Sequence, residues 1–155
     1  MRHLLAIAIA IAAAPDLARA GDLVGSETCR ACHPAAYAAW LEGPHAGALE
    51  SLPPQSRSDH RCLSCHAPAS EAGQAGVGCE ACHGPGRLYA AGYVMRDAEL
   101  ARALGLVVPG EKACLACHTD STPSLQKFDF SRKVKLIQHG EPRGAPGAAQ
   151  SPPAR

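Results

Sequence analysis

Apolar positions along this chain follow no long helical or strand period, and only three segments carry the start and stop signals of a helix. The predicted helices cover residues 34–42, 97–104 and 128–138. The first begins at Pro34 and stops at Gly43-Pro44, while the second opens on an acidic turn and ends before Gly105. Because no alternating run is long enough for a sheet, we predict a mainly α chain with much irregular loop, including residues 51–59.

The two ends of the chain differ in composition from the part between them. Residues 1–20 have the pattern of a secretory signal, with Arg2, an apolar run and Ala18-Arg19-Ala20 before the cleavage point. The apolar run is about 11 residues long and a bilayer span needs roughly 20, so we expect a cleaved signal and a periplasmic product. Residues 140–155 are rich in Gly and Pro and predict a flexible tail, which leaves 21–139 as one domain.

The composition of that domain leaves its interior unexplained. Aromatic residues make up only 4% of the chain, and with 15 Gly and 13 Pro few bulky side chains are available for a core. The formal charge is +1 and no block of Lys or Arg occurs, which excludes a nucleic-acid binder with a basic surface. Something other than side chains must therefore fill the interior.

Eight cysteines occur as four copies of the pattern C-x-x-C-H, with none left over. The cysteines are Cys29, Cys32, Cys62, Cys65, Cys79, Cys82, Cys114 and Cys117, and the histidines that follow them are His33, His66, His83 and His118. This pattern is the signature of c-type haem attachment. Two residues between the thiols let both sulfurs bond one porphyrin, and the next residue places an imidazole under the iron. The sequence therefore predicts four covalently attached haem c groups, which form the core of a small multihaem cytochrome c fold.

A zinc ribbon or a set of disulfides fits the cysteines less well. Cys62, Cys65, Cys79 and Cys82 have the spacing of a zinc ribbon, and an exported protein can form disulfides. Neither kind of site requires a histidine after every cysteine pair.

The segment between the second and third motifs is short. Only thirteen residues separate Cys65 from Cys79, and three of them are glycines. The second and third haems are therefore predicted to be neighbours that exchange electrons rapidly.

Ligands for the second face of each iron are scarce. Apart from the motif histidines and His3 of the signal, only His45, His60 and His139 remain for four irons. One iron is therefore predicted to be open or to have another ligand, such as Met95, Lys112 or a group from a partner chain. An open iron binds small molecules, whereas an iron with two imidazoles only exchanges electrons.

Two blocks around these motifs resemble a known family. One is Val24-Gly25-Ser26-Glu27-Thr28-Cys29-Arg30-Ala31-Cys32-His33, followed by Tyr37, Trp40 and Gly43-Pro44-His45-Ala46, and the other is Gly76-Val77-Gly78-Cys79-Glu80-Ala81-Cys82-His83-Gly84-Pro85-Gly86. They are similar to the tetrahaem cytochrome c family of ammonia-oxidising bacteria, the five-five-four type. The resemblance extends over roughly residues 23–140, although the chain is shorter than full-length members.

This resemblance implies a mostly helical fold with haems stacked in near-parallel pairs, three irons with two histidines each and one five-coordinate iron. It also implies periplasmic electron transfer in nitrogen metabolism, with electrons accepted from a hydroxylamine-oxidising multihaem enzyme, and for some members reduction of nitric oxide at the open haem. Relatives often carry a histidine shortly after Gly84-Pro85-Gly86, where this chain has Arg87-Leu88-Tyr89. Tyr89 is therefore a predicted neighbour of an unfilled site.

No conventional set of acid, base and nucleophile is present, so we expect an electron-transfer protein rather than an enzyme. Its expected partners are periplasmic or membrane-bound redox proteins, with donor and acceptor undetermined, and neither nucleic acid nor a membrane span is expected for the mature chain. Two alternatives stay open. One is a small reductase of nitric oxide, nitrite or hydroxylamine with Tyr89, Arg87 or Lys112 beside an open iron, and the other is a structural or sensory subunit of a larger complex.

Overall fold

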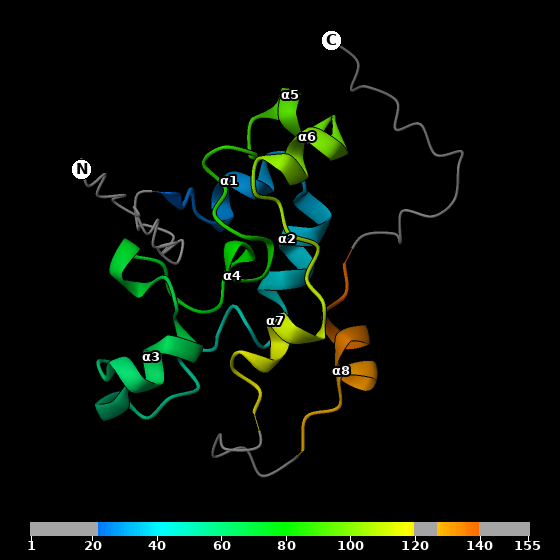
Figure 1. Cartoon of the computed structure of the whole chain (residues 1–155). Helices are drawn as coiled ribbons and strands as arrows, with labels where there is room; N and C mark the ends of the chain where they lie inside the picture. The colour runs from blue at the N-terminus through cyan, green and yellow to red at the C-terminus, as the bar shows by residue number, and fades with distance from the viewer. Residues whose placement is uncertain (1–21, 120–126, 140–155) are drawn as a thin grey trace, which may run out of the picture.

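The computed structural model describes residues 22–119 and 127–139, and the predicted signal and tail lie outside them (Figure 1). The helices are α1 (Ser26–Arg30), α2 (Pro34–Leu41), α3 (His60–His66), α4 (Cys79–His83), α5 (Gly92–Met95), α6 (Ala98–Ala103), α7 (Glu111–Leu115) and α8 (Phe130–Ile137), with short 3-10 turns at Pro54–Ser56 and Ser70–Ala72. No strand occurs in the described residues. The prediction of a mainly α chain with much irregular loop is confirmed.

The three predicted helices are α2, α6 and α8, each slightly shorter than predicted. Proline stands in the first turn of α2, where its missing N–H costs nothing. Asp97 caps α6 by accepting hydrogen bonds from the N–H groups of Glu99 and Leu100. Asp129 caps α8 in the same way through the N–H of Arg132, so the segment before Asp129 is not helical. One 3-10 turn interrupts the predicted loop at residues 51–59.

The helices that the sequence pattern did not predict are α1, α3, α4, α5 and α7. Four of them carry cysteines of the C-x-x-C-H motifs, and none of the five exceeds seven residues. A helix of one or two turns is too short to show a 3.6-residue apolar period, because the period needs a window of about 11 residues.

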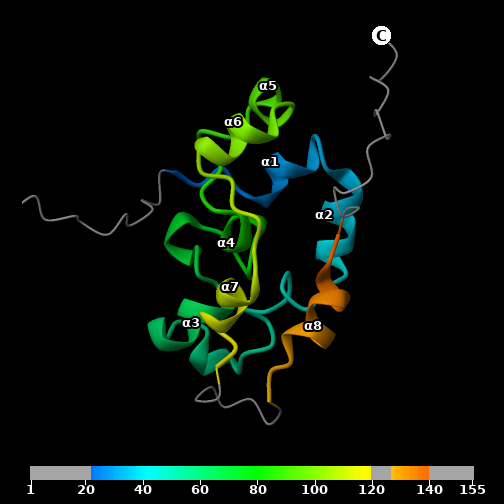
Figure 2. The same cartoon turned by 45° about the vertical axis from the view of Figure 1, so that its right-hand side comes forward.

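The helices lie around α4, which is central in two views (Figures 1 and 2). In both views α1, α5 and α6 lie above α4, whereas α3 and α7 lie below it with α8 beside them. We call α1, α4, α5 and α6 the upper half and α3, α7 and α8 the lower half.

Glu80 joins α4 to the start of the described chain. Its side chain is only 7% exposed and accepts three backbone hydrogen bonds, from Val24 (2.9 Å), Gly25 (2.8 Å) and Gly86 (2.6 Å). A carboxylate that accepts several N–H groups forms strong, charge-assisted hydrogen bonds. Since Cys29 follows Gly25 by one turn of α1, Glu80 fixes the first motif against the third.

The residues just before α4 hold a second distant segment. The N–H of Val77 donates to the carbonyl of His45 at 2.9 Å, and the indole N–H of Trp40 donates to the carbonyl of Val77 at 2.9 Å. Gly76 is buried with a φ of 72°, and a Cβ at this position would clash with the carbonyl oxygen of Ala46. Glycine is required here because no other residue combines this φ with so close a backbone approach.

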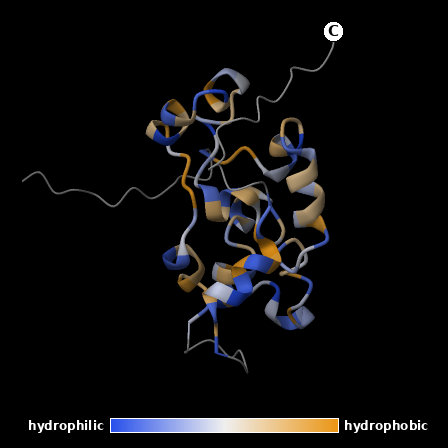
Figure 3. Ribbon diagram, turned by 90° about the vertical axis from the view of Figure 1, so that its right-hand side faces the viewer, coloured by the Kyte–Doolittle hydropathy of each residue, from blue (hydrophilic) through white to orange (hydrophobic). Residues whose placement is uncertain are grey.

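Few side chains are buried. In the described residues the buried apolar side chains are Ala67, Tyr89, Val94 and Ala101, and the last three form one cluster beside α5 and α6. Figure 3 shows apolar and polar residues mixed along the short helices rather than gathered into one apolar layer. The side chains alone thus supply little interior, as the composition predicted.

Candidate haem sites

Each C-x-x-C-H motif is folded as one turn of helix. The second and third motifs lie within α3 and α4, and the first and fourth continue from α1 and α7 with hydrogen bonds from the N–H of His33 to Cys29 and from the N–H of His118 to Cys114, both 2.9 Å. Residues three and four positions apart share one face of a helix. Two thiols and one imidazole therefore face the same side in every motif, as attachment of one porphyrin requires.

The cysteines form neither a disulfide nor a metal-binding group in the part of the chain that the structure describes. All eight are free thiols. Among the described residues no three His, Cys, Asp or Glu side chains come together in a group that could hold a metal ion. The thiols are partly exposed or exposed.

Thiols of different motifs lie near one another. The thiol of Cys29 hydrogen-bonds Cys79, which lowers the pKa of Cys79 to about 6 and raises the pKa of Cys29. Burial, together with a hydrogen bond to Cys65, raises the pKa of Cys117 to about 11. Burial raises the pKa of Cys82, and the charge of Cys114 raises it further. The first motif therefore lies beside the third, the third beside the fourth, and the fourth beside the second.

Two of the three remaining histidines face a motif histidine. The ring centroids of His45 and His118 are 6.2 Å apart, and those of His83 and His139 are 6.0 Å apart. With metal–nitrogen bonds of about 2 Å, two imidazoles on opposite faces of one iron have centroids about 6 Å apart. The described residues therefore fit two irons with two histidine ligands each.

The protonation of these rings suits ligation. Burial lowers the pKa of His45, with a smaller effect from the charge of His118. Burial also lowers the pKa of His83, against the effect of its hydrogen bond to Val107. Both shifts favour the neutral imidazole, which is the form that binds a metal.

The other predicted ligands are placed differently. His60 is exposed in the first turn of α3, and its ring contacts no other histidine in the described residues. Met95 packs against the apolar cluster beside α5 and α6, and Lys112 is exposed on α7. In the part of the chain that the structure describes, no second histidine ring faces His33 or His66.

Sequence reasoning missed the groups that hold the ligand rings. The Nδ1 atoms lie against backbone carbonyls: His66 against Ala48 (2.8 Å), His83 against Val107 (3.0 Å) and His139 against Ile137 (3.0 Å). Such bonds fix the ring and leave Nε2 for the metal. Nothing in the sequence marks a carbonyl for this role, because every residue has one.

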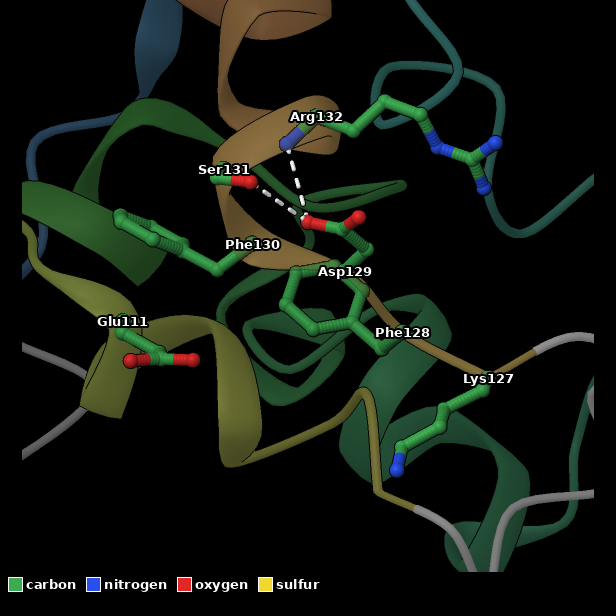
Figure 4. A pocket seen from close by; sticks show the side chains of 7 residues that line it. All are labelled: Glu111, Lys127, Phe128, Asp129, Phe130, Ser131 and Arg132. Atoms are coloured by element: carbon green, nitrogen blue, oxygen red, sulfur yellow. Dashed lines mark hydrogen bonds between the residues drawn. The ribbon is translucent and has the colours of Figure 1, made fainter.

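A hollow of about 670 Å³ lies between α7 and α8 (Figure 4). The side chains that line it are Glu111, Lys127, Phe128, Asp129, Phe130, Ser131 and Arg132. Two aromatic rings line it, and its charged side chains are two basic and two acidic residues. It adjoins the fourth motif, since Glu111 begins α7 and the ring of Phe128 stacks on His118 with centroids 4.7 Å apart.

Part of the chain is similar in sequence to known proteins. Residues 28–84 match the family model described as cytochrome c554 and c-prime. The chain is 31% identical over 99 residues to cytochrome c-554 of Nitrosomonas europaea, and the match covers 46% of this chain and 42% of that protein. No solved structure matches the chain. The resemblance drawn from the motifs is confirmed over residues 28–84, which are similar to the cytochrome c554 and c-prime family.

Proposed function

We propose that this chain is a periplasmic tetrahaem cytochrome that carries single electrons between redox proteins. The observation that carries the proposal is that all four C-x-x-C-H motifs present two thiols and an imidazole on one face, as described above. Cys29 and Cys32, Cys62 and Cys65, Cys79 and Cys82, and Cys114 and Cys117 would each hold one haem, with His33, His66, His83 and His118 as axial ligands.

Haem iron supplies a one-electron redox centre, and the chain orients and insulates it. His45 together with His118, and His139 together with His83, would each hold one haem iron, and an iron held by two imidazoles would exchange electrons without binding a substrate. The cysteine contacts support a path in the order first, third, fourth and second haem. The expectation that the second and third haems are direct neighbours, drawn from the short connection between their motifs, stays a prediction.

Export rests on the sequence of residues 1–20. No helix in the described ranges is long and apolar enough to cross a membrane. From the signal-like pattern of residues 1–20 we place the mature chain in the periplasm, where its redox partners are other periplasmic proteins or the exposed domains of membrane proteins.

Charge indicates where such a partner binds. Residues 127–139 carry four basic residues and one acidic residue, whereas residues 22–119 carry ten acidic and seven basic residues. The basic side chains of α8, which are Arg132, Lys133 and Lys135, form no ion pair with the described residues. Because α8 leads directly to His139, an acidic partner on α8 would lie close to the third haem.

A reductase acting at an open iron is the second candidate function. It is favoured by the absence of a second histidine ring beside His33 and His66 in the described residues. The polar groups suggested for it are largely engaged elsewhere. The hydroxyl of Tyr89 donates to the carbonyl of Gly84 at 2.6 Å, and Arg87 pairs with Asp22 at 2.7 Å. We therefore retain electron transfer as the main function.

The test is the mass of the exported protein together with low-temperature EPR of its ferric form. We expect a mass that includes four haems and low-spin signals from the irons held by His45–His118 and His83–His139. Fewer than four haems would overturn the tetrahaem proposal. If the protein reduced nitric oxide, nitrite or hydroxylamine with turnover, reductase activity would replace electron transfer as the main function.

A further inference from the structure

The histidine ligands are held in two different ways. His66, His83 and His139 have an Nδ1 atom within 3.0 Å of a backbone carbonyl, so a hydrogen bond fixes the plane of each ring. His118 has no such bond among the described residues, although it belongs to the same kind of motif. An imidazole ring rotates about its Cβ–Cγ bond unless a hydrogen bond or packing holds its plane.

Phe128 supplies that packing. Its ring lies 4.7 Å from the ring of His118, with an angle of only 13° between the two planes. The start of α8 fixes the position of Phe128. Asp129 accepts hydrogen bonds from the hydroxyl of Ser131 (2.8 Å) and from the N–H of Arg132 (3.1 Å), which fixes the backbone directly after Phe128 (Figure 4).

We infer that Phe128 is a positioning residue that sets the plane of the His118 imidazole, and through it the angle between the two axial ligands of the fourth haem. This inference rests on the proposed function, because it takes His118 and His45 as ligands of one iron. The planes of these two rings differ by 45°. A change in the packing of Phe128 rotates the His118 ring, and this changes the angle between the two ring planes without breaking a covalent bond.

The angle between axial imidazoles has an electronic consequence. Each imidazole donates π electron density along one direction in the haem plane, so the relative orientation of two rings decides how far two of the iron d orbitals are split. The g values of a low-spin ferric iron report this splitting directly. The effect is local, because the third haem has ligands that are fixed by hydrogen bonds instead.

The experiment compares the ferric EPR spectra of the full chain and of three variants. Phe128→Leu removes the stacking ring and keeps an apolar side chain of similar size. Phe128→Tyr keeps the ring. Phe130→Leu is the matched control, because Phe130 lines the same hollow but has no ring contact with a histidine among the described residues.

We expect Phe128→Leu to shift or broaden the low-spin signal of one haem and to leave the others unchanged, and we expect Phe128→Tyr and Phe130→Leu to keep the parent spectrum. An unchanged spectrum of Phe128→Leu, with four haems present, overturns the inference. So does an equal shift in Phe130→Leu, since that would show general loosening of α8. If the parent protein itself lacks low-spin signals of two-histidine irons, the proposed function fails before Phe128 is tested.

Discussion

The upper half of the molecule makes part of its own interior, whereas the lower half makes almost none. In the upper half, Tyr89, Val94 and Ala101 form a buried cluster and Glu80 binds three backbone N–H groups. In the lower half, the only buried apolar residue in the described ranges is Ala67, and α7 and α8 are separated by the hollow described above. We therefore expect the lower half to depend on haem for its stability more than the upper half does, although each carries two of the four motifs.

The largest effect should come from removing a haem of the lower half. With Cys114→Ala and Cys117→Ala together, we expect hydrogen exchange of α3, α7 and α8 to approach the rate of an unfolded chain, because no apolar cluster remains there. The matched change in the upper half, Cys29→Ala with Cys32→Ala, should leave the cluster around Val94 protected. Equal loss of protection in both variants would show that the two halves do not differ in their dependence on haem.

Glu80 should be the side chain on which the upper half depends most. Glu80→Ala leaves one buried and two partly buried N–H groups without their acceptor, and we expect the free energy of unfolding to fall by about 3 kcal/mol. Denaturant unfolding of the haem-loaded protein measures this. Glu71→Ala, at an exposed position, should change stability by less than about 0.5 kcal/mol. A loss below about 1 kcal/mol for Glu80→Ala would show that Glu80 does not hold the first motif against the third.

Gly76 connects the two halves, because it packs against the segment that brings His45 to His118. Gly76→Ala should displace that segment and convert the iron of the fourth motif from low spin to high spin, which absorption and EPR spectra would show. The control is Gly73→Ala. Gly73 has a similar φ of 75° but nothing within 4 Å of an added Cβ, so strain of about 1 kcal/mol is expected there without a change of spin state.

Charge on α8 should have the smallest effect. Lys133→Glu with Lys135→Glu should slow oxidation by ferricyanide, an anionic probe, by roughly 2- to 10-fold at low ionic strength and much less at high salt. Arg96→Glu with Arg102→Glu makes the same change of net charge near α5 and α6. If that control slowed the reaction equally, net charge and not α8 would govern the encounter.

The sequence predicted the chemistry of the sites better than their arrangement. The C-x-x-C-H motifs predicted the attachment residues, and the count of three spare histidines predicted a shortage of ligands. The pairing of His45 with the fourth motif could not be predicted, since it depends on Gly76 and Val77 holding a segment that lies 73 residues before His118. His60 suits a ligand by residue type, and the structure places it exposed in the first turn of α3 with no histidine ring against it in the described residues.

The fold was predictable where capping signals stand beside ordinary helices. Asp97 and Gly105 marked the limits of α6, and Pro34 marked the start of α2. The motif helices were missed because one or two turns are too short to show an apolar period. The role of Glu80 was also missed, since a glutamate between two cysteines has no pattern that predicts burial.

The single tryptophan of the chain gives the protein a built-in optical reporter. Trp40 is half-buried and hydrogen-bonds the carbonyl of Val77, two residues before Cys79. An excited indole transfers its energy to a nearby porphyrin, so its fluorescence is quenched when haem is attached and recovers when attachment fails. Maturation of the protein can therefore be followed by emission from its own indole, with no label added.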